Sequence, residues 1–168
     1  MIELNKKTQQ DFLNREWVQK LLDAGVDMSD AKYFICSLRY GSFNKVHNIQ
    51  IALKEELPWV KDTPGHLPAL QYNWACPTYT ISELLYKLHE WIYPTIDGEE
   101  YSGGLRLSKD APFYLAYYHL QNLDKTKWSE DFYAEAEYPI ESLAMLLIQC
   151  HKKDIGLKEK DTGNISDK

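Results

Sequence analysis

The chain has 168 residues, of which 44% are hydrophobic, 13% aromatic and 26% charged. This composition is typical of one globular domain, and it excludes a chain disordered throughout, a collagen-like chain and a disulfide scaffold. The formal net charge is −6, and the positive charge comes mainly from scattered lysines, so nucleic acid and anionic membranes are poor partners.

The N-terminal residues 1–7 lack the apolar stretch and small-residue cleavage site of a secretory signal, and no segment reaches the ~18 apolar residues of a membrane span. We therefore expect a cytoplasmic location without membrane association. The three cysteines, Cys36, Cys76 and Cys150, lack the close spacing of zinc ligands, so we expect neither a metal nor a cofactor. Cys36 and Cys150 fall in apolar segments, where a thiol behaves as a small core hydrophobe.

In chain order, the first predicted element is a helix that begins at Thr8 and ends at Gly25, because apolar residues recur between them at helical spacing. A turn at 27–30 and a strand at 33–38 follow. A second strand at 47–53 is expected to pair with the first. Segment 58–77 contains four prolines, which predicts a long ordered loop.

A capping box at Thr80 and Glu83 precedes an apolar stripe and predicts a helix up to about Trp91. The dipeptides Asp97-Gly98 and Gly103-Gly104 predict turns. Three further strands form an antiparallel meander, and their predicted ranges are 105–107, 113–120 and 131–138. A last helix begins at Pro139, which suits the first position of a helix.

These elements predict a single α+β domain over residues 1–157. Its antiparallel sheet contains the C-terminal meander plus one or two N-terminal strands, with three helices packed mainly on one face. Residues 158–168 contain one apolar side chain, which predicts a disordered C-terminal tail.

Three segments follow one another in a distinctive order and spacing: Leu21-Leu22-Asp23-Ala24-Gly25, the stretch 74–85 that enters the central helix, and the stretch 139–148. With the aromatic meander between the last two, this arrangement resembles a loose group of small uncharacterised proteins from phages and mobile elements of gut bacteria. Residues 33–53 depart from that pattern. The resemblance implies an accessory protein inside the cell, and it assigns no functional residue.

Motifs of enzymes are scarce. A Gly-x-Ser-x-Gly elbow is absent, and no two histidines share a helix face as they do in helical zinc sites. His89 is the best catalytic candidate, because it lies with Tyr86 and Tyr93 beside the apolar stripe of the central helix. A small hydrolase or transferase with His89 in a cleft is therefore one alternative. The simpler interpretation is a half-buried imidazole at the margin of the core.

Acidic residues gather in the second half of the chain and form a solvated face in the simplest interpretation. A decoy inhibitor that occupies a nucleic-acid-binding protein is a further alternative, provided that these acids form one surface. They are Glu99, Glu100, Glu130, Asp131, Glu135, Glu137 and Glu141.

Aromatic side chains crowd the meander, at Tyr114, Tyr117, Tyr118, Trp128 and Tyr133. Both faces of strand 113–120 carry large aromatic residues, whereas only one face can lie on the helices. Tyrosine and tryptophan are enriched where proteins meet partners. We therefore predict a non-enzymatic interaction protein that binds a protein partner or a second copy of itself through this aromatic face. The alternative is that the loop 58–77 covers it.

Overall fold

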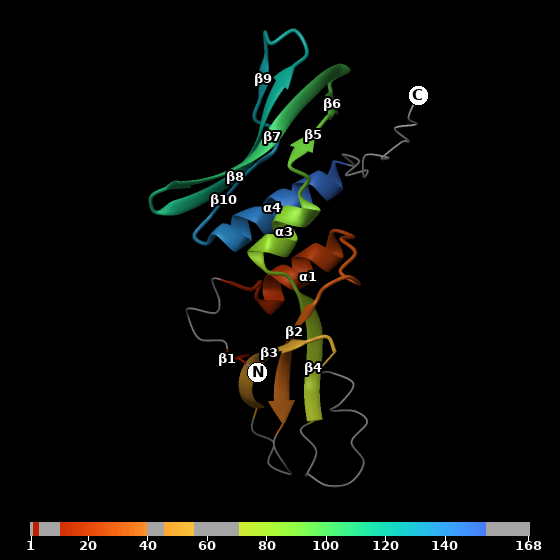
Figure 1. The fold of residues 1–168 in the computed structure, drawn as a ribbon, viewed down its shortest axis with the longest axis vertical. Coiled ribbons are helices and arrows are strands. Elements are labelled where there is room, and N and C mark those ends of the chain that lie inside the picture. The colour runs from red at the N-terminus through yellow and green to blue at the C-terminus, as the bar shows by residue number, and fades with distance from the viewer. Residues whose placement is uncertain (1, 4–10, 40–45, 56–70, 154–168) are drawn as a thin grey trace, which may run out of the picture.

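The computed structural model describes residues 2–3, 11–39, 46–55 and 71–153. Within these residues, two antiparallel sheets lie at opposite ends of an elongated molecule, with three helices between them (Figure 1). The predicted α+β class and antiparallel pairing are confirmed. The strands form two sheets, however, so the N-terminal strands do not join the meander in a single sheet.

The N-terminal sheet has four strands in the order β1-β3-β2-β4. Their bounds are β1 (Ile2–Glu3), β2 (Tyr33–Arg39), β3 (Val46–Leu53) and β4 (Gln71–Thr78). The two strands predicted at 33–38 and 47–53 are β2 and β3, and they pair as expected. The prediction of a loop over 58–77 is wrong for its last part, which forms β4. Pro77 fits there because β4 is an edge strand. Residues 56–70 lie outside the described residues.

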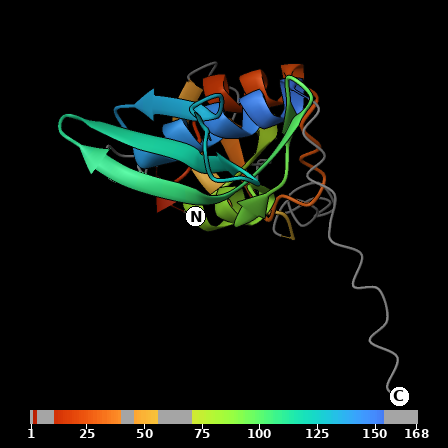
Figure 2. The same cartoon turned by 90° about the horizontal axis from the view of Figure 1, so that it is seen from above.

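The C-terminal sheet has six strands in the order β10-β8-β7-β5, with β6 paired to β7 and β9 paired to β8. Their bounds are β5 (Trp91–Ile92), β6 (Thr95–Ile96), β7 (Glu99–Asp110), β8 (Phe113–Asn122), β9 (Trp128–Ser129) and β10 (Tyr133–Ala136). The long hairpin of β7 and β8 projects past the helices (Figure 2). The predicted meander is therefore present.

Of the two predicted glycine turns in this sheet, one is confirmed. Asp97 and Gly98 adopt φ angles of 51° and 82° and connect β6 to β7, as a two-residue hairpin turn requires. Gly103 and Gly104 instead lie inside β7. A Cβ atom at Gly103 would lie 2.1 Å from the carbonyl oxygen of His119. This glycine therefore permits a close approach of β7 to β8.

The helices are α1 (Arg15–Asp23), α3 (Ile81–Lys87) and α4 (Pro139–Lys152). Asn14 caps α1, since its side chain accepts a hydrogen bond of 3.1 Å from the amide of Trp17, and the predicted start at Thr8 lies outside the described residues. Gly25, with φ of 83°, follows α1 as predicted. The capping box of α3 is confirmed, but the helix ends at Lys87 and the chain then forms β5. Pro139 opens α4, also as predicted.

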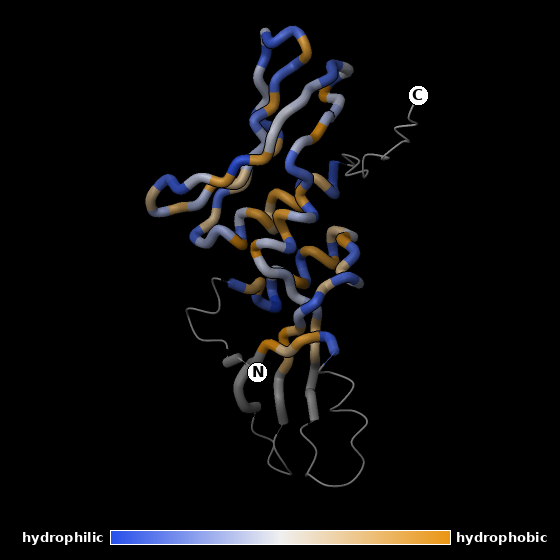
Figure 3. Tube along the Cα trace, in the orientation of Figure 1, coloured by the Kyte–Doolittle hydropathy of each residue, from blue (hydrophilic) through white to orange (hydrophobic). Residues whose placement is uncertain are grey.

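Apolar residues of all three helices form one large core with the inner face of the C-terminal sheet. α4 lies on β8 and β10, and both α1 and α3 pack against α4. Figure 3 shows the hydrophobic stretches concentrated in this helical layer. α4 therefore makes the most extensive contact with the sheet, and the other two helices pack on α4. Cys150 belongs to this core and Cys36 is also fully buried, as the apolar context of both predicts.

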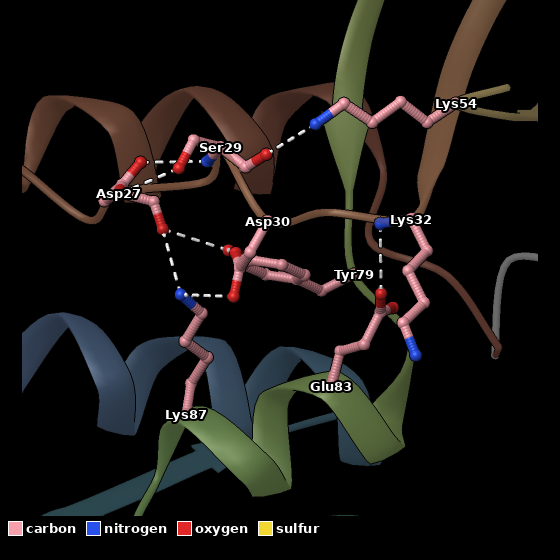
Figure 4. A network of polar contacts seen from close by, with 8 residues as sticks. All are labelled: Asp27, Ser29, Asp30, Lys32, Lys54, Tyr79, Glu83 and Lys87. Carbon is pink, nitrogen blue, oxygen red and sulfur yellow. Dashed lines mark hydrogen bonds and ion pairs between the residues drawn. The ribbon is translucent and has the colours of Figure 1, made fainter. Parts of the chain in front are cut away.

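Tyr79 connects the N-terminal sheet to the helical layer, because β4 leads through it into α3. Its ring is buried, and its hydroxyl donates a hydrogen bond of 2.7 Å to Asp30 (Figure 4). Lys87 reaches the same carboxylate at 2.8 Å. Glu83 closes the capping box and also accepts a bond of 3.2 Å from the amide of Lys32. These contacts fix α3 against the loop that leads into β2.

Substituting Gly103 should destabilise the fold much more than substituting its neighbour. Gly103→Ala places a methyl group against the backbone of β8 and should lower the free energy of unfolding by about 3 kcal/mol. Gly104→Ala is the matched control. Its Cβ would meet the Trp91 side chain at 3.1 Å, which can shift, so the change should stay below about 1 kcal/mol. Urea denaturation measures both. Equal losses would contradict this account of β7.

Removing the hydroxyl of Tyr79 should also destabilise the protein. Tyr79→Phe should lower the free energy of unfolding by about 1.5–3 kcal/mol, the range for a hydrogen bond to a charged group. Tyr86→Phe is the control, because Tyr86 is 80% exposed and should change stability by less than about 0.5 kcal/mol. Chemical denaturation of the three proteins gives the comparison, and an unchanged Tyr79→Phe variant would show that the bond adds nothing.

The effect of Tyr79→Phe should depend on pH through Asp30. Burial opposes ionisation of this carboxyl, but hydrogen bonds from Lys87 and Tyr79 outweigh it and lower the pKa of Asp30. A lowered folded-state pKa stabilises the protein above the unfolded value of about 3.9, and that stabilisation is lost as the pH falls through the folded value. The difference between the wild type and Tyr79→Phe should therefore shrink in acid. A difference that grows in acid would contradict this assignment.

Candidate binding groove

Strand β8 separates two sets of side chains. Ala116, Tyr118 and Leu120 point into the core and are at most 1% exposed. The phenol of Tyr118 donates a hydrogen bond of 2.7 Å to the backbone oxygen of His89, and burial raises the pKa of this tyrosine. Because side chains alternate along a strand, Tyr117 and His119 lie on the opposite face. Tyr117 is half-buried there and His119 is exposed.

The strand that runs beside β8, on the side away from β7, is interrupted. β9 pairs with β8 at Leu120 and Gln121, whereas β10 pairs with it from Tyr114 to Tyr117. Residues 130–132 connect the two strands. Phe132 within them turns its ring into the core, where it is 1% exposed, and its carbonyl accepts a hydrogen bond of 3.0 Å from the amide of Tyr118. The detour leaves a hollow of about 530 Å³ on the outer face.

We call this hollow the aromatic groove. It is lined by Leu115, Tyr117, Tyr118, His119, Trp128, Ser129, Glu130, Phe132 and Tyr133. Trp128 and Tyr133 are 57% and 42% exposed. The rings of His119 and Trp128 lie 4.3 Å apart and are tilted by 48°. Their contact gives the groove one wall of two tilted rings, which limits the movement of the exposed indole.

Carboxylates make the rim of the groove negative. Glu130 lines it, and Glu135 accepts a hydrogen bond of 2.8 Å from the hydroxyl of Tyr133. The hydrogen bond to Glu135, then burial, then the charges of Glu135, Asp110 and Glu130 raise the pKa of Tyr133. Loss of a proton from this phenol is thus disfavoured by nearby negative charge. The same charges attract a cation into the groove.

The structure brings together three of the five aromatic residues predicted to form a binding surface. Tyr117, Trp128 and Tyr133 all line the groove. Tyr118 also borders it, but its side chain is 1% exposed and belongs to the core. Tyr114 lies on the same inward face as Tyr118, half-buried, with Lys109 Nζ 5.3 Å from its ring. Tyr118 is therefore a core residue that only borders the groove, and Tyr114 lies on the opposite face from Tyr117. The sequence does not indicate which face of β8 is covered.

Leu115 and His119 are groove residues that the sequence did not point to, and Glu130 was expected only as part of an acidic face. Leu115 and His119 flank Tyr117 at a spacing of two and therefore share its face. This two-residue period predicts that Leu115 and His119 line the groove, once Tyr117 is assigned to the outer face. Glu130 carried no such signal, since its place at the groove depends on the detour between β9 and β10.

The residues of the predicted catalytic cleft, His89, Tyr86 and Tyr93, line neither of two hollows formed by the described residues. Tyr86 and Tyr93 are 80% and 64% exposed, while His89 is half-buried and its carbonyl accepts the bond from Tyr118. His89 does not line the aromatic groove. It is also absent from a second hollow, of about 360 Å³, which lies between Trp17 on α1 and Met145 on α4. The catalytic alternative therefore gains no support from geometry.

Three other groups that could take part in chemistry are protonated or paired with a lysine. Burial raises the pKa of Cys150 to about 12, so its thiol is a poor nucleophile. Glu99 and Asp131 form ion pairs with Lys127 and Lys153. These pairs reduce the acidic surface that a nucleic-acid decoy requires. Among the described ranges, no group of three or more His, Cys, Asp or Glu side chains is placed to hold a metal ion.

Comparison of the chain with protein-family models, with curated proteins and with solved structures finds no match. In the part of the chain that the structure describes, no helix is both long and apolar enough to cross a membrane.

Proposed function

We propose that this protein is a non-enzymatic binding protein whose aromatic groove receives a cationic side chain, lysine or arginine, of a partner protein. One observation carries the proposal: exposed aromatic rings and the carboxylate of Glu130 border the same hollow, and a second carboxylate, that of Glu135, is hydrogen-bonded to one of these rings. Trp128, Tyr133 and His119 supply the rings, and Glu130 and Glu135 supply the charge.

The rings favour a protein ligand. Tyrosine and tryptophan give a large contact area with few rotatable bonds, and each keeps a polar group for a hydrogen bond. A hollow of about 530 Å³ is within the size range of small ligand pockets and accommodates one long side chain with the backbone on either side. The tilted rings of His119 and Trp128 contact one another and present their aromatic faces to the groove.

The charges select a cation. Lysine and arginine are attracted to the faces of tryptophan and tyrosine, and more strongly when carboxylates lie nearby. The molecule itself shows such contacts, with Lys20 Nζ 4.0 Å from the ring of Trp17. Nucleic-acid bases also stack on aromatic side chains, but that use requires a positive groove for the phosphates. Glu130 and Glu135 repel phosphates instead.

The wider context of this proposal comes from the sequence. We propose from it that the protein acts in the cytoplasm, as an accessory protein of a phage or mobile element. The proposed binding needs no cofactor and no metal. Catalysis by His89 is not proposed, since His89 lines neither of the two hollows described above. Inhibition as an acidic decoy is not proposed either, since Lys127 and Lys153 form ion pairs with Glu99 and Asp131.

Short peptides test the charge selection directly. We expect acetyl-Gly-Arg-Gly-amide to shift the NMR signals of Trp128 and of residues 115–119, because its guanidinium enters the groove. Acetyl-Gly-Glu-Gly-amide should leave these signals in place, since Glu130 and Glu135 repel it. Titration of the isotope-labelled chain measures both. Equal shifts with the two peptides, or shifts confined to other surfaces, would contradict the proposal.

Variants locate the binding on the groove. Trp128→Ala should raise the dissociation constant of the arginine peptide at least about tenfold, as expected when an exposed aromatic anchor is lost. Leu123→Ala is the control, because Leu123 is 64% exposed but does not line the groove. It should bind as the wild type does. If both variants bind the peptide unchanged, the groove is not the site.

A further inference from the structure

The second half of β7 has one unoccupied edge. β5 pairs with β7 at Gly103 and Gly104, and the amide of Leu105 donates a last hydrogen bond of 2.9 Å to the carbonyl of Glu90. Beyond it, no described residue pairs with 106–110 on the side away from β8. All five of these residues are exposed, and Figure 2 shows the hairpin extending into solvent. Such an edge is a template for another strand.

The direction of the backbone groups follows from the bond made by Leu105. Its amide points to the β5 side, so the odd-numbered residues of β7 direct their N–H and C=O groups to that side and the even-numbered ones direct theirs to β8. Leu107 and Lys109 therefore present two donors and two acceptors at the open edge. A strand of four or five residues is enough to engage all four groups.

We propose that the occupant of this edge is the same edge of a second copy, paired antiparallel about a two-fold axis through Ser108. In this register Leu107 of each copy forms a hydrogen-bonded pair with Lys109 of the other. Arg106 of each copy lies opposite Asp110 of the other. Antiparallel pairing of identical segments is the simplest self-complementary interface, since one patch serves both copies.

Charge favours this register over its neighbours. Only residues that direct their backbone groups to the open edge can bond to one another, so the axis must pass through a residue and not between two residues. The neighbouring registers therefore have their axis at Leu107 or at Lys109. An axis through Lys109 places two lysines face to face, which is unfavourable. An axis through Leu107 opposes Arg106 to Ser108 and forms no ion pair. The axis through Ser108 forms two pairs of opposite charge, each at a position where side chains of facing strands approach most closely.

The interface is separate from the groove but lies on the same sheet. Arg106 and Asp110 are the register partners of Tyr117 and Phe113 on β8, so they share the outer face with Tyr117. Dimerisation therefore joins two C-terminal sheets into one surface that carries two aromatic grooves. A partner with two cationic segments would bind such a surface more tightly than a monomer.

Reciprocal charge reversal tests the register. Arg106→Asp alone and Asp110→Arg alone each place like charges opposite one another, and should weaken self-association at least about tenfold. An equimolar mixture of the two variants restores both ion pairs, and should form a heterodimer about as stable as the wild-type dimer. Sedimentation velocity of the full chain over a range of concentrations measures each species.

Two controls make the result specific. Asp124→Lys changes an exposed charge in the turn between β8 and β9 and should leave the dimer intact. Lys109→Pro removes one backbone donor at the edge and should produce a monomer, with circular dichroism to confirm the fold. A wild-type chain that stays monomeric up to about 1 mM would overturn the proposal, because its dimer would then have a dissociation constant above the millimolar range. Single charge variants that dimerise as the wild type does would overturn it too. Peptide binding in the groove is measured independently of both outcomes.

Discussion

The hydrogen bond of Tyr118 to the backbone of His89 fixes the faces of strand β8, and the rest of the C-terminal half depends on this orientation. With Tyr118 inside, Ala116 and Leu120 also point to the helices and complete the core. A shift by one residue would exchange the two faces and expose the whole apolar set. Tyr117 and His119 lie on the outer face for this reason, and so does the groove that they line with Trp128.

The two proposed surfaces use different properties of the same sheet. The groove depends on side chains, gathered where residues 130–132 interrupt the strand beside β8. The open edge of β7 depends on the backbone, with Arg106 and Asp110 setting the register. Neither surface involves the N-terminal sheet, which Tyr79 and Asp30 attach to the helical layer. The molecule thus separates a supporting part from the part that carries both proposed surfaces.

Much of the fold could be predicted from the sequence, because its signals are local. Gly25, the capping box at Thr80 and Pro139 at the start of α4 all act within a few residues. The errors arose where distant contacts decide. Gly103 lies inside a strand because β8 approaches it closely, and β4 tolerates Pro77 because it is an edge strand. For the site, the aromatic residues were recognised, but their division between two faces depends on which one the helices cover.

Hydroxyl-radical footprinting of the free protein, read by mass spectrometry, tests the central claim that β8 has one buried and one exposed aromatic face. Trp128 and Tyr133 should be oxidised fastest, Tyr117 at an intermediate rate and Tyr118 slowest, in the order of their exposure. The adjacent pair is decisive, since Tyr117 and Tyr118 have the same chemistry and differ only in the face they occupy. Equal rates for the two, or faster oxidation of Tyr118, would contradict this arrangement of the strand.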